Sequence, residues 1–174
     1  MPDSTLSQAL REAYAAAPSA VIVYHTLEIN HPAFTAPIRV VRDVVDLTAT
    51  LEATAPHDPS TAVLFVAFRF DIVPPDVQPT SIPQCVIEMD NVGREIVAQL
   101  DLAMASGNLI TCIYRQFIGT DLSAPQNNPP LTLTISAISA TPLRVRATAG
   151  FTNLANKRFP GEDYTAERFP GLIP

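Results

Sequence analysis

Histidine and cysteine are the first residues to consider for chemistry in this chain, because imidazole and thiolate groups can bind metals or act in catalysis. The one cluster with mixed metal-ligand types is His25, Glu28 and His31. In an extended strand, His25 and His31 lie on one face and Glu28 points to the other. The helical zinc motif HExxH is absent from the sequence. The spacing therefore argues against a metal site, and we interpret the two histidines as hydrogen-bonded side chains around a strand end.

The two cysteines, Cys85 and Cys112, lie in the apolar contexts QCVIEM and ITCIYR, without the CxxC spacing of a zinc or redox site. A catalytic thiolate needs surroundings that lower its pKa, such as a neighbouring cation or a helix N-terminus. Their neighbours are apolar and β-branched instead. We therefore predict two buried free thiols that form neither a disulfide nor a metal pair.

Motifs for group transfer are also missing. The sequence has no GxSxG nucleophile elbow and neither of the glycine loops that hold phosphates, GxxxxGK and GxGxxG. Pairs of carboxylates could serve acid–base chemistry, but each pair lies in a turn or connector where acids are simply solvated. These pairs are Asp43/Asp46, Asp71/Asp76 and Glu162/Asp163. We predict that the chain is not an enzyme; a small hydrolase is the least favoured alternative.

The net charge is −6, from 17 acidic and 11 basic residues. A negative surface repels phosphate backbones, so we expect no nucleic-acid partner. No window approaches the ~20 apolar residues that span a bilayer. The first residues, Met1 to Ser4, lack the basic and apolar parts of a secretion signal. We therefore expect a soluble protein made in a cytoplasm, without membrane insertion.

Five arginines fall at or inside expected strands, and two of them, Arg144 and Arg146, share a face under the period-2 rule. Two interpretations are open at this stage. The arginines either form a solvated sheet face or pair with acids of a neighbouring subunit, since the chain is acid-rich elsewhere. The other three are Arg39, Arg42 and Arg69.

Hydrophobic periodicity predicts two helices in an α+β, mainly β chain. The segment Ser4–Ala17 has apolar residues at helical spacing and stops at Pro18. A second helix, at about 92–105, carries an apolar residue at every fourth position and ends at Gly107. This helix is expected to pack on the β-structure.

About eight strands are expected from β-branched and alternating segments. They cover residues 20–30, 37–42, 46–52, 62–70, 84–89, 109–117, 131–140 and 143–149. In 62–70 even and odd positions are both apolar, which predicts a central strand covered on both faces. The last two strands should form a hairpin around Thr141 and Pro142. We predict a small β-barrel or sandwich as a single domain over residues 1–150.

Proline is unusually frequent, with 17 in 174 residues against a usual share of ~5%. Four prolines stand in residues 74–83, and residues 151–174 carry Phe-Pro-Gly twice. We expect both segments to be extended arms that lose little entropy on ordering and contact neighbouring subunits; packing of the two phenylalanines on their own domain is the alternative. The candidate interface residues are Pro74, Pro75, Pro79, Pro83, Phe159, Pro160, Gly161, Phe169, Pro170 and Gly171.

Four segments resemble, in their order, a family of tailed phages and prophages known only as domain of unknown function 1833. These segments are Leu27 to Phe34, Ile38 to Val41, Ile87 to Val92, and Arg168 to Leu172. The resemblance covers nearly the whole chain. It implies a virion tail protein.

A weaker likeness extends to the amino-terminal part of the minor tail protein L family, which caps the tail tube at the tip of lambda-like phages. It rests on the segment Tyr114 to Phe117 and on the step Phe159 to Gly161. That family continues into a cysteine-rich domain with an iron–sulfur cluster, which usually takes four thiolates. Because this chain has two cysteines, the likeness implies a hub-like domain without the cofactor.

We therefore predict a non-enzymatic structural protein of a phage tail tip or baseplate, located in the virion and without a cofactor. It is expected to form a ring with itself and to contact tail-tube, hub or central-fibre proteins. A closed ring needs a heterologous interface, in which one surface of each copy meets a different surface of the next. The alternative is an assembly factor or small binding module that works in the host cytoplasm and is absent from the particle.

Overall fold

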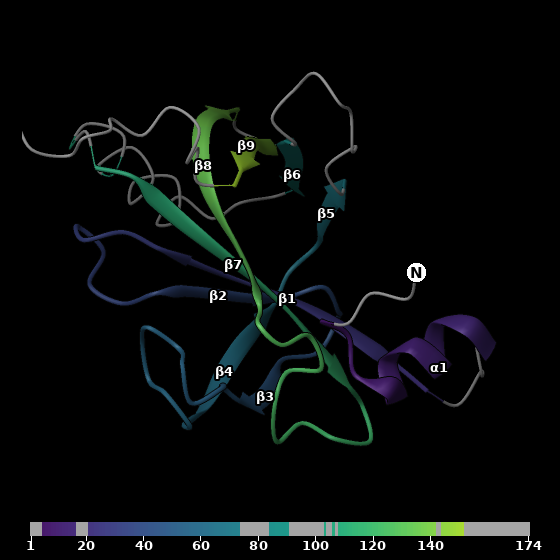
Figure 1. Cartoon of the computed structure of the whole chain (residues 1–174). Helices are drawn as coiled ribbons and strands as arrows, with labels where there is room; N and C mark the ends of the chain where they lie inside the picture. The colour runs from purple at the N-terminus through teal and green to yellow at the C-terminus, as the bar shows by residue number, and fades with distance from the viewer. Residues whose placement is uncertain are drawn as a thin grey trace, which may run out of the picture.

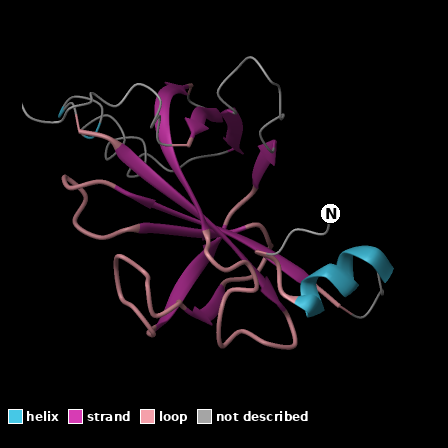
Figure 2. Cartoon of the chain, in the orientation of Figure 1, coloured by secondary structure: helices cyan, strands magenta, loops and turns pink. Residues whose placement is uncertain are grey.

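The computed structural model describes residues 5–16, 21–73, 84–90, 103, 106, 108–141 and 144–151. Most of these residues form β-strands, and helix α1 (Gln8–Ala16) lies at one side of them (Figure 2). Within this part of the chain no helix is long and apolar enough to cross a membrane. The strands are β1 (Val23–Asn30), β2 (Ile38–Val41), β3 (Leu47–Thr50), β4 (Ala62–Ala67), β5 (Phe70–Val73), β6 (Gln84–Asp90), β7 (Ile110–Ile118), β8 (Leu131–Ala140) and β9 (Arg144–Gly150).

All nine strands belong to one sheet, in the order β3-β4-β2-β1-β7-β8-β9-β6-β5. Neighbouring strands are antiparallel except β2 and β4, which run parallel. The predicted mainly β fold is confirmed. Of the predicted alternatives, a small barrel or a sandwich, the barrel is excluded because the sheet does not close.

The sheet stays open because its two ends fold over opposite faces of the central strands. Leu27 and Ile29 of β1 face the larger core, which β5, β6, β8 and β9 complete. Val41 of β2 and Phe117 of β7 face a second core, which they share with Phe65 and other residues of β3 and β4. Figure 1 shows β3 and β4 on one side of β1, β2 and β7, and the remaining strands on the other. The central strands therefore have a core on each face.

Strand β4 differs from the prediction. We expected one strand over 62–70, covered on both faces, but β4 ends at Ala67 and a separate strand, β5, follows. Val63 and Phe65 are buried in the smaller core, whereas Leu64 and Val66 are exposed. β4 lies second from the edge of the sheet. Only one of its faces is covered. Apolar residues at both odd and even positions therefore did not indicate that both faces of the strand are buried.

The remaining predicted elements agree with the structure where residues are described. α1 lies within the predicted helix, and β8 and β9 form the predicted antiparallel pair. Of the second predicted helix, at about 92–105, only Ala103 is described; Ala103 and Ser106 are both helical, and Ala103 packs in the larger core. The rest of that helix lies outside the described residues.

Candidate functional site

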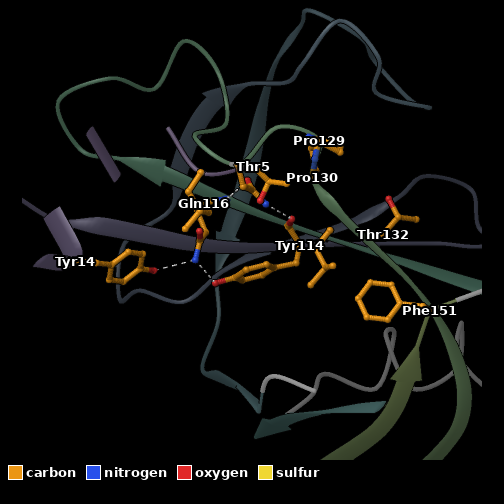
Figure 3. A pocket seen from close by; sticks show the side chains of 11 residues that line it. Thr5, Tyr14, Tyr114, Gln116, Pro129, Pro130, Thr132 and Phe151 are labelled. Carbon is orange, nitrogen blue, oxygen red and sulfur yellow. Dashed lines mark hydrogen bonds between the residues drawn. The ribbon is translucent and has the colours of Figure 1, made fainter. Parts of the chain in front are cut away.

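A pocket of about 440 Å³ lies over β7, and we call it the β7 pocket. Its lining includes Tyr114 and Gln116 from β7 and Tyr14 from α1. Residues 129–132 and Phe151 complete most of the lining. Figure 3 shows Tyr14 and Phe151 at opposite ends of this pocket, with the ring of Tyr114 between them.

The N-terminal segment reaches the pocket through a short backbone pairing. Leu6 and Asn127 form an antiparallel bridge. On either side of it, Ser7 N donates to Gln126 O at 2.8 Å, and Asn128 N donates to Thr5 O at 2.8 Å. The hydroxyl oxygen of Ser7 then accepts from Leu10 N at 3.1 Å, which caps the start of α1. This pairing places Tyr14 beside β7.

The Asn127 side chain joins this pairing to the backbone of β7. Its Oδ1 accepts from Gln116 N at 3.0 Å and its Nδ2 donates to Tyr114 O at 3.0 Å. The register of β8 against β7 reaches only to the pair Tyr114 and Leu131. The buried Asn127 side chain therefore satisfies β7 backbone groups where β8 no longer pairs.

A chain of hydrogen bonds crosses the pocket wall. Gln116 Nε2 donates to the hydroxyl oxygens of Tyr14, at 2.9 Å, and Tyr114, at 2.7 Å. Both amide hydrogens are thereby used, and the Tyr114 hydroxyl also contacts His25 Nδ1 at 2.5 Å. Which of these two groups donates depends on the tautomer of His25, because a phenol oxygen can accept two hydrogen bonds. The hydroxyl proton of Tyr14 is left to donate into the pocket.

The groups of this wall are neutral at physiological pH. Burial raises the pKa of Tyr114 to about 12 and also raises the pKa of Tyr14. Burial, with a smaller contribution from the charge of Arg42, lowers the pKa of His25. A general acid or base works best with a pKa near the operating pH. Tyr114 is far from that range, so the arrangement suits recognition of a neutral ligand better than proton transfer.

The three residues of the histidine cluster are not brought together. His25 contacts Tyr114, whereas Glu28 lies on the other face of β1 and accepts from Arg39 Nε at 2.9 Å. His31 Nδ1 accepts from Ala33 N at 3.0 Å, and its Nε2 lies 3.0 Å from the hydroxyl of Ser106. In the described ranges no three histidine, cysteine or acidic side chains are placed to share a metal ion.

A buried ionic network, which the sequence did not predict, lies on the other side of β7. Arg115 is fully buried, binds Glu52 with two hydrogen bonds of 2.8 Å, and lies 3.3 Å from Glu28. Arg39 joins Glu28 to Asp58, whose φ of 51° is left-handed. The network ties the loop after β3 to β1, β2 and β7. One sequence signal was available: Arg115 shares its face of the strand with the apolar residues Ile113 and Phe117, and a charge at an inward position needs a partner.

The arginines on the sheet surface pair within the chain. Arg144 Nε lies 2.7 Å from Asp90, and Arg146 Nε lies 3.5 Å from Glu88, directly across from each other on β9 and β6. Arg144 and Arg146 are exposed. Within the chain this pair lies on a solvated sheet face, as the first interpretation has it; pairing with acids of a neighbouring subunit stays a hypothesis.

Both cysteines are buried and free, as predicted. Burial raises the pKa of the Cys112 thiol to about 12 and also raises the pKa of Cys85. These thiols are therefore protonated at neutral pH and poor nucleophiles.

All ten candidate interface residues, in 74–83 and in the C-terminal arm, lie outside the described residues. The prediction that they contact neighbouring subunits stays a prediction. Phe151, where the predicted arm begins, lies at the β7 pocket.

A family model described as "Domain of unknown function (DUF1833)" matches residues 9–164. The chain belongs to this family. The predicted resemblance to this family is thereby confirmed; three of its four segments lie in the matched range, and Arg168 to Leu172 lies beyond it. No curated protein matches the chain. The likeness to the minor tail protein L family is not shown and stays a hypothesis.

Proposed function

We propose that this chain is a structural protein of a phage tail tip or baseplate, which assembles as a ring and links tail proteins to one another. The observation that carries this proposal is an exposed apolar surface, the β4 patch, made of Val44, Val45, Leu64 and Val66. Large exposed apolar surfaces mark sites of protein interaction. The sequence resemblance to a family of tailed phages supplies the setting.

The β4 patch is held in place by the turn between β2 and β3. Val44 and Val45 stand in this turn with 92% and 67% of their surface exposed. Asp46 Oδ1 accepts from Ala67 N at 2.7 Å, which fixes the turn beside the end of β4. The exposed valines are thus presented by a hydrogen-bonded turn next to the exposed face of β4. A surface fixed in this way loses little entropy on binding.

A ring needs a second, different surface on each copy. We assign this role to the proline-rich segment 74–83, which follows β5, and to the arm 151–174. The neighbours are further copies of the chain and the tail-tube, hub or central-fibre proteins.

The chemistry of the described residues supports a non-enzymatic role without a cofactor. The wall of the β7 pocket is neutral, and the thiol of Cys112 has a pKa raised to about 12. The alternative, an assembly factor or binding module absent from the particle, draws its support from the β7 pocket, because a preformed pocket also suits transient binding.

Mass spectrometry of purified virions and of infected-cell lysates separates these functions. A structural protein is expected in the particle at several copies, after purification that removes loosely bound protein. Abundance in the lysate together with absence from virions would overturn the structural proposal and leave the assembly factor.

A further inference from the structure

We propose that the β7 pocket binds a Phe-Pro-Gly step from the C-terminal arm of a second copy of this chain. This inference rests on the self-assembly part of the proposed function. The Phe-Pro-Gly step is then the ligand of the pocket, and the pocket is the point at which the arm attaches to a neighbouring copy.

The pocket has the chemistry of a site for a proline-containing segment. Tyr14, Tyr114 and Phe151 supply aromatic rings, and Pro129 and Leu131 supply further apolar surface. Extended proline-containing segments dock in grooves lined by aromatic side chains, because proline rings pack on aromatic faces. The volume of about 440 Å³ lies within the ~300–1,000 Å³ usual for binding pockets.

The polar atoms match such a segment too. A proline has no N–H and keeps its carbonyl oxygen, so the segment presents more backbone acceptors than donors. The Tyr14 hydroxyl, which accepts from Gln116, has its proton available for a carbonyl oxygen. The neutral wall places no charge against an apolar ligand.

The chain carries this ligand twice, at Phe159-Pro160-Gly161 and Phe169-Pro170-Gly171. An arginine precedes each step, which suits the surface of a protein with a net charge of −6. The arm starts at Phe151, and Phe169, 18 positions later, can lie up to about 60 Å from it. A compact domain of this size has a radius of gyration of about 15 Å. The arm is thus long enough to reach the pocket of a neighbouring copy, and that contact is heterologous, as a ring requires.

Two full-length variants test the contact. The arm variant carries Phe159→Ala and Phe169→Ala, and the pocket variant carries Tyr14→Ala and Phe151→Ala. Tyr14 and Phe151 are 52% and 42% exposed, so neither change empties the core. Arg11→Ala, an exposed residue on the same helix as Tyr14, is the matched control. Circular dichroism checks that each variant is folded.

Analytical ultracentrifugation then measures each variant alone and the two mixed. Each variant alone is expected to associate at least tenfold more weakly than the natural chain and the Arg11→Ala control. The mixture should form heterodimers, because one partner retains its pocket and the other its arm. Association of either variant at natural strength would overturn the proposal. So would a mixture without heterodimers, which would place any such contact within one chain.

A labelled peptide of residues 166–174 provides a second measurement that needs no oligomer. Titrated into the arm variant, it should bind saturably. Phe169→Ala in the peptide, or adding Tyr14→Ala to the protein, should weaken binding at least tenfold, and Tyr14→Phe by a smaller factor. Absent binding, or equal binding to the protein with Tyr14→Ala, would overturn the inference. Peptide binding without the protein in virions would instead contradict only the proposed function.

Discussion

Arg115 and Glu52 are joined by two parallel hydrogen bonds, with Nε 2.8 Å from Oε2 and Nη2 2.8 Å from Oε1. The Arg115 side chain is fully buried, and that of Glu52 is nearly so. The pair connects the loop after β3 to the central strand β7, 63 positions later. Removing the Glu52 charge would leave buried Arg115 with Glu28, at 3.3 Å, as its anionic partner, and weakening the compensation of a buried charge costs more than losing an exposed ion pair.

Glu52→Gln is therefore expected to lower the free energy of unfolding by about 3 kcal/mol. Asp71→Asn is the matched control, because Asp71 forms an exposed ion pair with Arg42 at 2.7 Å, and it should cost less than about 1 kcal/mol. Urea denaturation of both variants measures the difference. Equal effects would show that the buried pair has no special role in stability.

Asn127→Ala should lower the free energy of unfolding by about 2 kcal/mol, since it leaves two β7 backbone groups without their partner. Gln126→Ala is the control, because the half-buried Gln126 side chain bonds Ala124 O and the Asp121 carboxylate and not the backbone of β7. Hydrogen exchange adds a local readout, because the Gln116 amide should lose protection in the first variant and keep it in the second. Unchanged protection in Asn127→Ala would contradict the assigned role.

The pKa of His25 predicts a pH dependence of stability. Burial holds this pKa below its ordinary value of 6.5, so the unfolded chain binds the proton more tightly than the folded one. The stabilisation is complete above pH 6.5 and is lost as the pH falls through the lowered pKa. The natural chain should thus lose more stability between pH 7 and pH 5 than His25→Asn does. Urea denaturation at pH 7 and at pH 5 measures the free energy of unfolding of both proteins. If both lose the same free energy between the two pH values, the prediction is wrong.

The thiols of Cys85 and Cys112 should be unreactive in the folded protein. At pH 8 an aromatic disulfide reagent is expected to modify neither Cys85 nor Cys112 within minutes, because both are buried and their pKa values are raised. After unfolding in urea, two thiols per chain should react. Rapid reaction of either cysteine in the folded state would show that it is accessible.

Charges in the β4 patch should impair assembly and leave folding intact. The double change Val44→Asp with Val45→Asp is expected to weaken self-association at least tenfold. The free energy of unfolding should change by less than about 0.5 kcal/mol, because both side chains are exposed. Thr35→Asp, in the exposed loop between β1 and β2 at the other end of β2 from Val44, is the control. Sedimentation of the three proteins is the measurement, and undiminished association of the double variant would remove the patch from the interface.

The strands were readable from the sequence because their signal is local. β8 and β9 match the predicted hairpin, since Leu133 and Ile135 are buried and Thr132 is exposed. The sheet order was not readable. The parallel pair β2 and β4, and the folding of the two sheet ends over opposite faces, depend on contacts between distant segments that no local period encodes.

The β7 pocket could not be predicted from the sequence either, because segments that lie far apart in the sequence form it. Tyr14 meets Gln116 across 102 positions, through a pairing of residues 5–7 with 126–128 that leaves no repeat or motif. The histidine cluster drew attention because its residues are adjacent in sequence. Alternation correctly placed Glu28 on the face opposite His25, which is why these side chains cannot share a ligand.

The central claim, that this chain is a structural protein of a phage tail tip, is tested most directly by a reconstruction of an intact tail tip from a phage whose genome carries this sequence. The account predicts several copies of the nine-stranded sheet in a closed ring around the tail axis, each with its β4 patch or β7 pocket covered by a neighbour. A complete tip in which no copy of this sheet is found would contradict it.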